Sequence, residues 1–218
     1  HGDRTIQSGR CRYMYEFYRE IQRGPAALLL RSKRQSDGIR ILLSRDSGHL
    51  DSLSTPGTTH VQSRRAFSDV VTDLGFQFEY VTTKSVEDGA LSRDGIKLLV
   101  LPCVQVLTDK EAERIKGFVG KGGRLLYDVM PGTFDPAGHQ REKPILADAF
   151  GQWKQEGKAF ELPYKVASYG FMRGRGELGS RREELLVLLS KAGLKPMATA
   201  VDGDGRAVTN VEYTRFVR

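Results

Sequence analysis

Cys103 stands where a buried strand is expected to end, which is where several α/β enzymes keep a nucleophile. A cysteine serves as a nucleophile only when its pKa is lowered and a base lies within hydrogen-bond reach. His49 and His139 are the candidate bases. A nucleophile elbow needs a tight turn with small neighbours, but the neighbours here are proline and valine, and the next helix is expected only at Thr108. We therefore predict a packed, unreactive thiol. The alternative is a cysteine-dependent amidotransferase or peptidase relative.

A second strand, in the run GGRLLYD, ends at Asp128 and is followed by no Cys or Ser that could act as a nucleophile. Open parallel sheets bind ligands outside the carboxyl ends of their strands. In this sequence that edge is expected to hold Ser44, Ser47, His49, Cys103 and Asp128. A small-ligand or sugar-binding module that uses this edge is thus a further alternative.

Other patterns that could bind a metal or cofactor fail on spacing. The run DGDG at 202–205 has Arg206 at the next ligand position and no glutamate at the calcium-loop spacing, so it predicts a hairpin turn. The two cysteines lack zinc-site spacing. The run GKGG is a helix stop and lacks the order of a phosphate-binding loop. The remaining carboxylates lie mostly on expected helix surfaces, so we expect neither a metal nor a cofactor.

Composition is that of a protein able to bury a core. Of 218 residues, 39% are hydrophobic and 28% charged, and the net charge of +7 is spread along the chain. No nucleic-acid motif accompanies the basic run FMRGRGELGSRR, so we expect no nucleic-acid partner. No apolar run approaches the roughly 20 residues of a membrane span. The opening lacks a signal peptide's apolar segment and an initiator methionine, so we expect the middle of a longer protein. An address would lie upstream, so the location stays open, with the cytoplasm favoured.

Buried strands alternate with amphipathic helices along the chain. We expect helices over 10–23 and onward from 25, and strands near 39–44, 76–81, 96–101 and 124–129. Further helices are expected around 67–74, 109–120, the run ILADAFG, and 180–192. Capping boxes are predicted at Thr108–Glu111 and Ser180–Glu183. No assignment is made for 152–179. The alternation predicts an α/β domain with a mostly parallel sheet.

Three stretches resemble one family of enzymes. They are GIRILLSRDSGH, then GIKLLVLPCVQVLTDKEAERIKGFVGKGGRLLYDVMPG, then KPILADAFG. The shared elements are Leu101-Pro102, the Leu107–Asp109 helix start, Glu113-Arg114, Phe118-Val119, Gly122-Gly123 and the turn from Leu146 to Gly151. They resemble the middle, trimerisation domain of family 42-type β-galactosidases from about Gly38 to Gly151.

This resemblance implies a flavodoxin-like, class I glutamine amidotransferase-like three-layer sandwich. It also implies that residues 1–36 end an upstream catalytic barrel, that 37–195 form the α/β domain, and that 196–218 form a hairpin or start a β domain. The expected function is a non-catalytic oligomerisation domain of a glycoside hydrolase that acts on carbohydrate. In the family the catalytic glutamates lie upstream, so no catalytic residue is transferred to this chain.

The resemblance further implies a homo-oligomer, a trimer in the full-length parent. Large interfaces of this kind favour aromatic and Arg residues. The candidates lie after Gly151 and are Trp153, Tyr164, Tyr169, Phe171, Met172 and Arg173. Their alternative role is to fold back over the sheet as part of the core.

Overall fold

The computed structural model describes residues 9–53, 59–162, 166–178, 180–206, 208, 211 and 214–217. The chain divides into two compact units, one made of His1–Gln35 with Thr214–Arg218 and the other of Ser36–Tyr213. Each unit is described by itself.

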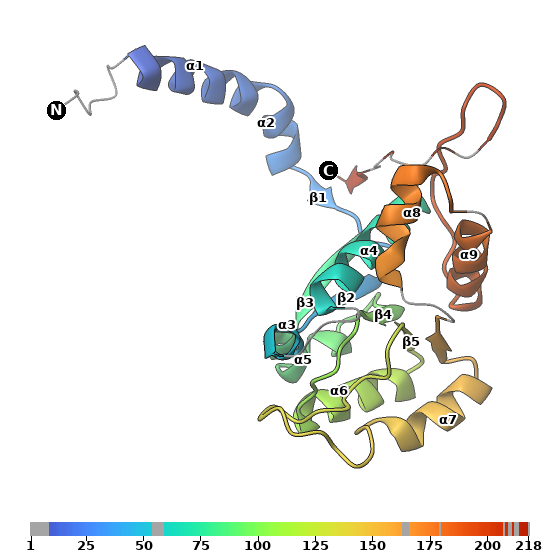
Figure 1. Cartoon of the computed structure of the whole chain (residues 1–218). Helices are drawn as coiled ribbons and strands as arrows, with labels where there is room; N and C mark the ends of the chain where they lie inside the picture. Colours follow the sequence, from blue (N-terminus) through green and yellow to red (C-terminus); the bar gives the residue numbers. More distant parts are fainter. Residues whose placement is uncertain are drawn as a thin grey trace. The chain divides into compact units, whose positions relative to one another are not determined.

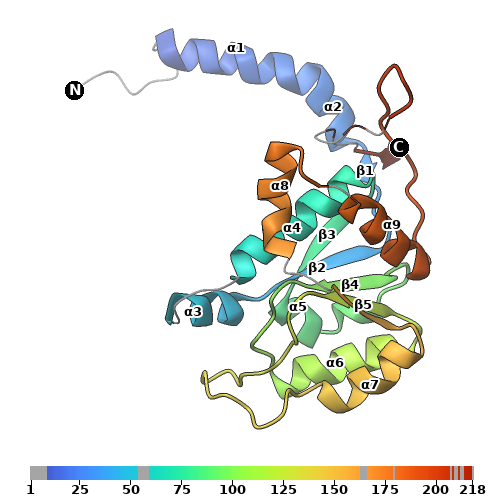
Figure 2. The same cartoon turned by 45° about the vertical axis from the view of Figure 1, so that its right-hand side comes forward.

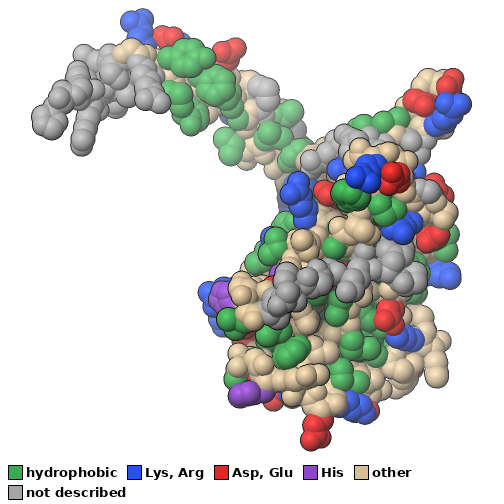
Figure 3. All heavy atoms as spheres, viewed as in Figure 1, with side chains coloured by type: hydrophobic (Ala, Val, Ile, Leu, Met, Phe, Trp, Pro, Cys, Tyr) green, Lys and Arg blue, Asp and Glu red, His purple; other side chains and the backbone are tan. Residues whose placement is uncertain are grey.

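The first unit contains helix α1 (Gly9–Arg23), helix α2 (Pro25–Leu30) and strand β1 (Lys33–Arg34), which pairs antiparallel with β7 (Phe216–Val217). Pro25 opens α2, where its fixed φ suits the first turn. The expected continuation of this helix beyond Leu30 is wrong, since Lys33 and Arg34 are paired as a strand. Hydrophobic side chains gather on the surface of α1 and α2 (Figure 3), and the exposed ones are Tyr13, Met14, Tyr15, Phe17, Tyr18, Leu28, Leu29 and Leu30.

The second unit is built around a five-stranded parallel sheet (Figure 1). Its strands are β2 (Ile39–Leu43), β3 (Phe78–Thr82), β4 (Leu98–Leu101), β5 (Arg124–Tyr127) and β6 (Ala159–Glu161). They lie in the order β3-β2-β4-β5-β6. Counted from β2, this is the flavodoxin-like order 2-1-3-4-5. Ile39 pairs with Phe78 on one side and with Leu98 on the other, so the order reverses at β2.

Helices cover both faces of the sheet (Figure 2). On one face lie α4 (His60–Asp73), α8 (Tyr169–Arg175) and α9 (Arg181–Lys191); on the other lie α5 (Thr83–Glu87), α6 (Asp109–Gly120) and α7 (Ala147–Gln155). Helix α3 (Arg45–Leu53) follows β2 directly, and two short 3₁₀ turns span Ala90–Ser92 and Val166–Ser168. The strands alternate as expected for two buried faces, with Ile41 in one core and Leu42 in the other. The predicted flavodoxin-like three-layer sandwich is confirmed.

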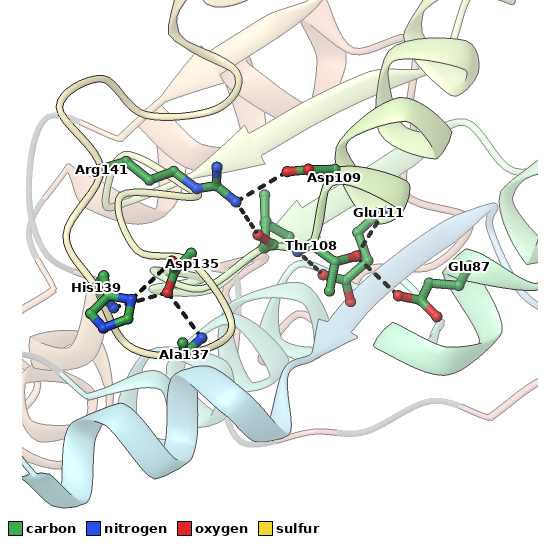
Figure 4. A network of polar contacts seen from close by, with 9 residues as sticks. Glu87, Thr108, Asp109, Glu111, Asp135, Ala137, His139 and Arg141 are labelled. Atoms are coloured by element: carbon green, nitrogen blue, oxygen red, sulfur yellow. Dashed lines mark hydrogen bonds and ion pairs between the residues drawn. The ribbon is translucent and has the colours of Figure 1, made fainter.

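The capping box at α6 is confirmed and is part of a larger polar network (Figure 4). The Thr108 N–H donates to Glu111 Oε2 at 2.7 Å, and the Glu111 N–H donates to Thr108 Oγ1 at 3.0 Å. Thr108 Oγ1 in turn donates to Glu87 of α5 at 3.0 Å. Arg141, on the long loop after β5, donates to the Leu107 carbonyl at 3.2 Å. This network fixes the turn between β4 and α6.

The second predicted capping box, at Ser180, is wrong. Ser180 has helical backbone angles and makes no cap bond, and its hydroxyl donates to Glu184 at 2.6 Å. A capping box that the sequence analysis did not identify opens α4, where the Thr59 side chain accepts from the Gln62 N–H. The unassigned stretch 152–179 supplies the last four residues of α7, together with β6 and α8.

Candidate functional site

The candidate site lies at the carboxyl ends of β2, β4 and β5. Ser44 follows β2, Cys103 follows β4 by two residues, and Asp128 follows β5 directly. Ligands of flavodoxin-like folds bind where the strand order reverses, which here is between β2 and β4. The structure therefore brings four residues of the predicted ligand edge together, namely Ser44, Ser47, Cys103 and Asp128, and all four are buried.

The first link across this edge is made by two serines. The Ser44 hydroxyl accepts from the Ser47 N–H at 3.2 Å and donates to the Ser47 hydroxyl at 2.9 Å. Ser47 Oγ also accepts from the Val106 N–H at 3.1 Å. The start of α3 is thus joined to the segment after β4, and both hydroxyls are engaged within the chain.

His60, the first residue of α4, makes the second link and is buried. Its Nε2 lies 3.1 Å from the Ser44 N–H, which can only donate, so Nε2 must accept. Nδ1 therefore carries the proton and donates to the Pro102 carbonyl at 2.6 Å. Burial lowers the pKa of His60, and the Arg64 charge lowers it further against the opposing effect of the Pro102 bond. The imidazole is thus held neutral in one tautomer.

Asp128 makes the third link. Its Oδ1 accepts from the Cys103 N–H at 2.8 Å and its Oδ2 accepts from the Ser63 hydroxyl at 2.5 Å. Burial raises the pKa of Asp128. The hydrogen bonds oppose this rise, and the one from Ser63 has the largest opposing effect. The carboxylate thereby ties β5 to the turn after β4 and to α4.

Cys103 has an unusual backbone conformation for a residue that is not glycine. Its φ is +41°, and its side chain is only 1% exposed. A positive φ in a residue with a Cβ is strained by roughly 1–3 kcal/mol and persists only where the surroundings hold it. The hydrogen bond from its N–H to Asp128 is such a constraint. As expected, the next helix begins only after Thr108, since α6 starts at Asp109.

Neither predicted base lies at the site. His49 is exposed on α3. His139 is 81% exposed in the loop after β5, where its ring lies 3.3 Å from Asp135 (Figure 4). The imidazole at this edge is His60, which the sequence analysis did not name. The Thr59-x-x-Gln62 pattern before an amphipathic helix was the signal that could have placed it.

Two of the predicted interface residues are in the core. Trp153 is 8% exposed and packs edge-on against Phe150, with 5.5 Å between ring centroids. Tyr169 is 0% exposed and donates to Asp73 at 3.1 Å. The burial of both residues supports the alternative in which this stretch folds over the sheet, because α7 and α8 each cover one face of the sheet.

The other described interface candidates differ from one another in exposure and in contacts. Phe171 is 61% exposed, so its assignment to an interface stays a prediction. Met172 is partly buried and accepts from Arg181 at 2.6 Å. Arg173 forms an ion pair with the buried Asp73 at 2.6 Å. Tyr164 lies outside the described residues.

The described part of the chain contains neither a cluster of metal ligands nor a helix suited to cross a membrane. No cluster of three or more His, Cys, Asp or Glu side chains able to hold a metal ion is found among these residues. None of the helices described is both long enough and apolar enough to span a bilayer.

Of the comparisons with known proteins, only the one with solved structures found similar chains. No protein-family model matches the sequence, and no curated protein is significantly similar to it. The β-galactosidase of Bifidobacterium adolescentis is similar over 54% of each chain, with 21% identity and a TM-score of 0.44. The β-galactosidase of the haloarchaeon Halorubrum lacusprofundi is similar over 55% of this chain and 18% of its own, with 18% identity and a TM-score of 0.47.

A third similar structure extends over more of the chain. The GH42 exo-carrageenase of Bacteroides ovatus is similar over 82% of this chain and 22% of its own, with 12% identity and a TM-score of 0.47. The chain thus spans about half the length of the first of these proteins and about a fifth of the other two. The solved structures to which this chain is similar are β-galactosidases and a GH42 exo-carrageenase.

Proposed function

We propose that this chain is a non-catalytic structural domain of a glycoside hydrolase related to family 42-type β-galactosidases, and that it helps to hold subunits together. One observation carries the non-catalytic part: the polar groups at the strand ends are bonded to one another. Both nitrogens of His60 and both oxygens of Asp128 have partners within the chain. Buried groups engaged in this way are not available to take a proton from a substrate.

The sequence motifs support the choice of parent. Leu101-Pro102 ends β4, the Leu107–Asp109 motif starts α6, Gly122-Gly123 precedes β5, and the Leu146–Gly151 turn opens α7. All four lie on elements that build the sheet and one of its helical layers. Motifs that build a scaffold in this way are what a structural domain needs, whereas catalysis by such a parent requires a barrel with paired carboxylates. The substrate of the parent would be a carbohydrate.

The proposal is tested by assaying the purified chain for hydrolysis of a nitrophenyl β-galactoside and of glutamine. No turnover above buffer is expected for either substrate. Turnover of glutamine that disappears in Cys103→Ser would replace the structural role by a cysteine-dependent one. Turnover of the galactoside by the chain alone would show that it contains catalytic carboxylates.

A second candidate function rests on the backbone of Cys103. Its positive φ, at the end of a parallel strand, is the geometry in which α/β enzymes present a nucleophile. This favours the cysteine-dependent alternative, although the thiol is buried and His60 is engaged elsewhere.

Thiol reactivity separates the two candidates. In a Cys11→Ser background, a structural Cys103 should react with a thiol reagent only as fast as the chain unfolds, because the side chain is 1% exposed. Urea should then accelerate the reaction by orders of magnitude. A rapid reaction well below pH 8 in the folded protein would instead indicate an activated nucleophile.

A further inference from the structure

A small cavity between α4 and α8 holds charges of both signs. Its volume is about 290 Å³, and the side chains that line it include Gln62, Arg65, Asp69, Phe171 and Arg173. α8 lies beside α4 in both views (Figures 1 and 2). Gln62, Arg65 and Asp69 follow one another at spacings of three and four residues, so they share one face of α4. The cavity is separate from the network at the strand ends.

Arg173, which lines the cavity, forms an ion pair with the nearby Asp73. Arg173 donates to Asp73 at 2.6 Å, and Tyr169 donates to the same carboxylate at 3.1 Å. The pair neutralises itself. The charges left over are those of Arg65 and Asp69, one of each sign.

Arg65 and Asp69 make no ion pair with each other or with any other residue that the structure describes. They are four residues apart on one helix, a spacing at which opposite charges usually meet. Asp69 is half-buried, and burial raises its pKa against the opposing charges of Arg173 and Arg65. The two arginines compensate this burial only at a distance, since neither forms an ion pair with Asp69, and a cation bound directly beside the carboxylate would stabilise its charge further.

Part of the remaining wall is apolar. Phe171 is largely exposed, and the Arg175 guanidinium lies 4.0 Å from its ring centroid. Ala66 and Ala167 also line the cavity. The cavity thus combines one free carboxylate, one free guanidinium and an aromatic surface.

We propose that this cavity binds a small zwitterion, a free α-amino acid with an apolar side chain. Its ammonium group would lie on Asp69, its carboxylate on Arg65 and its side chain against Phe171. A guanidinium binds a carboxylate with two parallel hydrogen bonds, and a carboxylate accepts from an ammonium, so each end of the ligand has a matching partner. An anion alone would be repelled by Asp69, and a cation alone by Arg65.

The size of the cavity fits this class of ligand. Ligand pockets usually range from about 300 to 1,000 Å³, so a cavity near the lower limit takes a molecule of a dozen or so non-hydrogen atoms. The site is open to water, so we expect dissociation constants on the order of a millimolar. This binding does not depend on the proposed structural role, because a chain without catalytic activity can still bind the ligand and can be titrated with it.

The test is a titration of the full chain, labelled with ¹⁵N, with L-phenylalanine followed by NMR. Two analogues each lack one charged group: phenethylamine lacks the carboxylate and 3-phenylpropionate lacks the ammonium. Saturable shifts are expected for amides of α4 and α8 with L-phenylalanine, and binding at least about tenfold weaker with either analogue. Equal binding of all three compounds would overturn the zwitterion assignment.

Charge variants identify the partner of each end. Asp69→Asn should bind L-phenylalanine no better than it binds 3-phenylpropionate, because the ammonium has lost its partner. Arg65→Gln should likewise lose the preference over phenethylamine. Asp94→Asn is the matched control, since it removes an exposed carboxylate outside the cavity. If Asp69→Asn keeps the full preference, the ammonium lies elsewhere and the proposal is wrong.

Gly170 allows the cavity to be filled without the removal of any group. A Cβ at Gly170 would lie 3.5 Å from Asp69 Oδ2, in ordinary contact, so Gly170→Leu should place its side chain beside that carboxylate. Leucine is also a better helix former than glycine, so α8 should persist. Loss of binding in a folded Gly170→Leu protein is expected. Unchanged shifts in that protein, or shifts from L-phenylalanine only outside α4 and α8, would overturn the site.

Discussion

Asp128 Oδ1 accepts a hydrogen bond from the backbone N–H of Cys103 at 2.8 Å, across the carboxyl ends of two neighbouring strands. The same carboxylate accepts from Ser63, so one side chain holds a strained backbone and a helix in place. In an enzyme built on this fold, a strand-end carboxylate would face the substrate. Here both of its oxygens accept from the chain itself, so the two hydrogen bonds act as a clamp on the backbone of Cys103 and on α4.

Removal of this carboxylate should be costly. Asp128→Ala removes the carboxylate that accepts from the buried Cys103 N–H and Ser63 hydroxyl, and each lost hydrogen bond should cost about 1–3 kcal/mol. Asp128→Asn keeps an acceptor for Cys103 and an amide for Ser63, and it also removes a buried charge, so it should cost about 1 kcal/mol or less. Urea unfolding of both proteins measures the difference. Equal midpoints for Asp128→Ala and wild type would show that the clamp contributes no stability.

The pH dependence of stability should contain a component from His60. Its pKa is lowered from 6.5 in the folded chain, so below about pH 6.5 the unfolded state takes up a proton that the folded state does not. The free energy of unfolding should therefore fall as the pH drops from 6.5 toward the lower folded pKa, by at most about 1.4 kcal/mol per pH unit.

Comparison of variants isolates this component from the carboxylates that titrate at lower pH. His60→Gln should be less stable near neutral pH but should lose the slope just below pH 6.5. His139→Gln serves as the control because its side chain is exposed and should leave that slope unchanged. Retention of the slope in His60→Gln would mean that another group is responsible for it.

Much of this fold could be predicted from the sequence, because a strand that is buried on both faces is a nearly continuous run of apolar residues. The runs Ile41–Leu43 and Leu98–Leu101 have no polar alternation. Thr108 with Glu111 is a local cap that depends on nearby residues alone. The three-residue β6 leaves a weaker signal, since Ala159–Glu161 is too short for a period to show.

The site was predicted less well, since its contacts are distant in sequence. His60 meets Pro102 across 42 residues, and Ser63 meets Asp128 across 65. No local pattern encodes such a pairing. The burial of Trp153 and Tyr169 is only one of two alternatives in the sequence, for a related reason. Aromatic residues in an unassigned stretch fit a core or an interface equally well until α7 and α8 are placed on the sheet.

Two glycines that precede β2 and β4 should differ in how well they tolerate a side chain. Gly38 and Gly95 both have positive φ, of +82° and +84°. A Cβ at Gly38 would lie 2.3 Å from the Gly95 carbonyl oxygen, whereas a Cβ at Gly95 meets nothing within 4 Å. Gly95→Ala should therefore cost only the conformational term of about 1–2 kcal/mol. Gly38→Ala should cost clearly more, since backbone must move. Chemical denaturation of the pair gives the answer, and equal losses would contradict the close approach.

The last prediction separates core from interface among the aromatic residues after Gly151. Trp153→Ala should destabilise the chain by about 3–5 kcal/mol, because it empties a packed site beside Phe150. Phe171→Ala should change stability little, because its side chain is largely exposed. If Phe171 lies in a subunit contact, light scattering should show weaker self-association for this variant, while Val187→Ala, at another exposed apolar position, associates like wild type. Self-association that is unchanged in Phe171→Ala would remove this residue from the interface. Weakened self-association together with unchanged binding of L-phenylalanine would assign Phe171 to the subunit contact and count against its place in the proposed cavity.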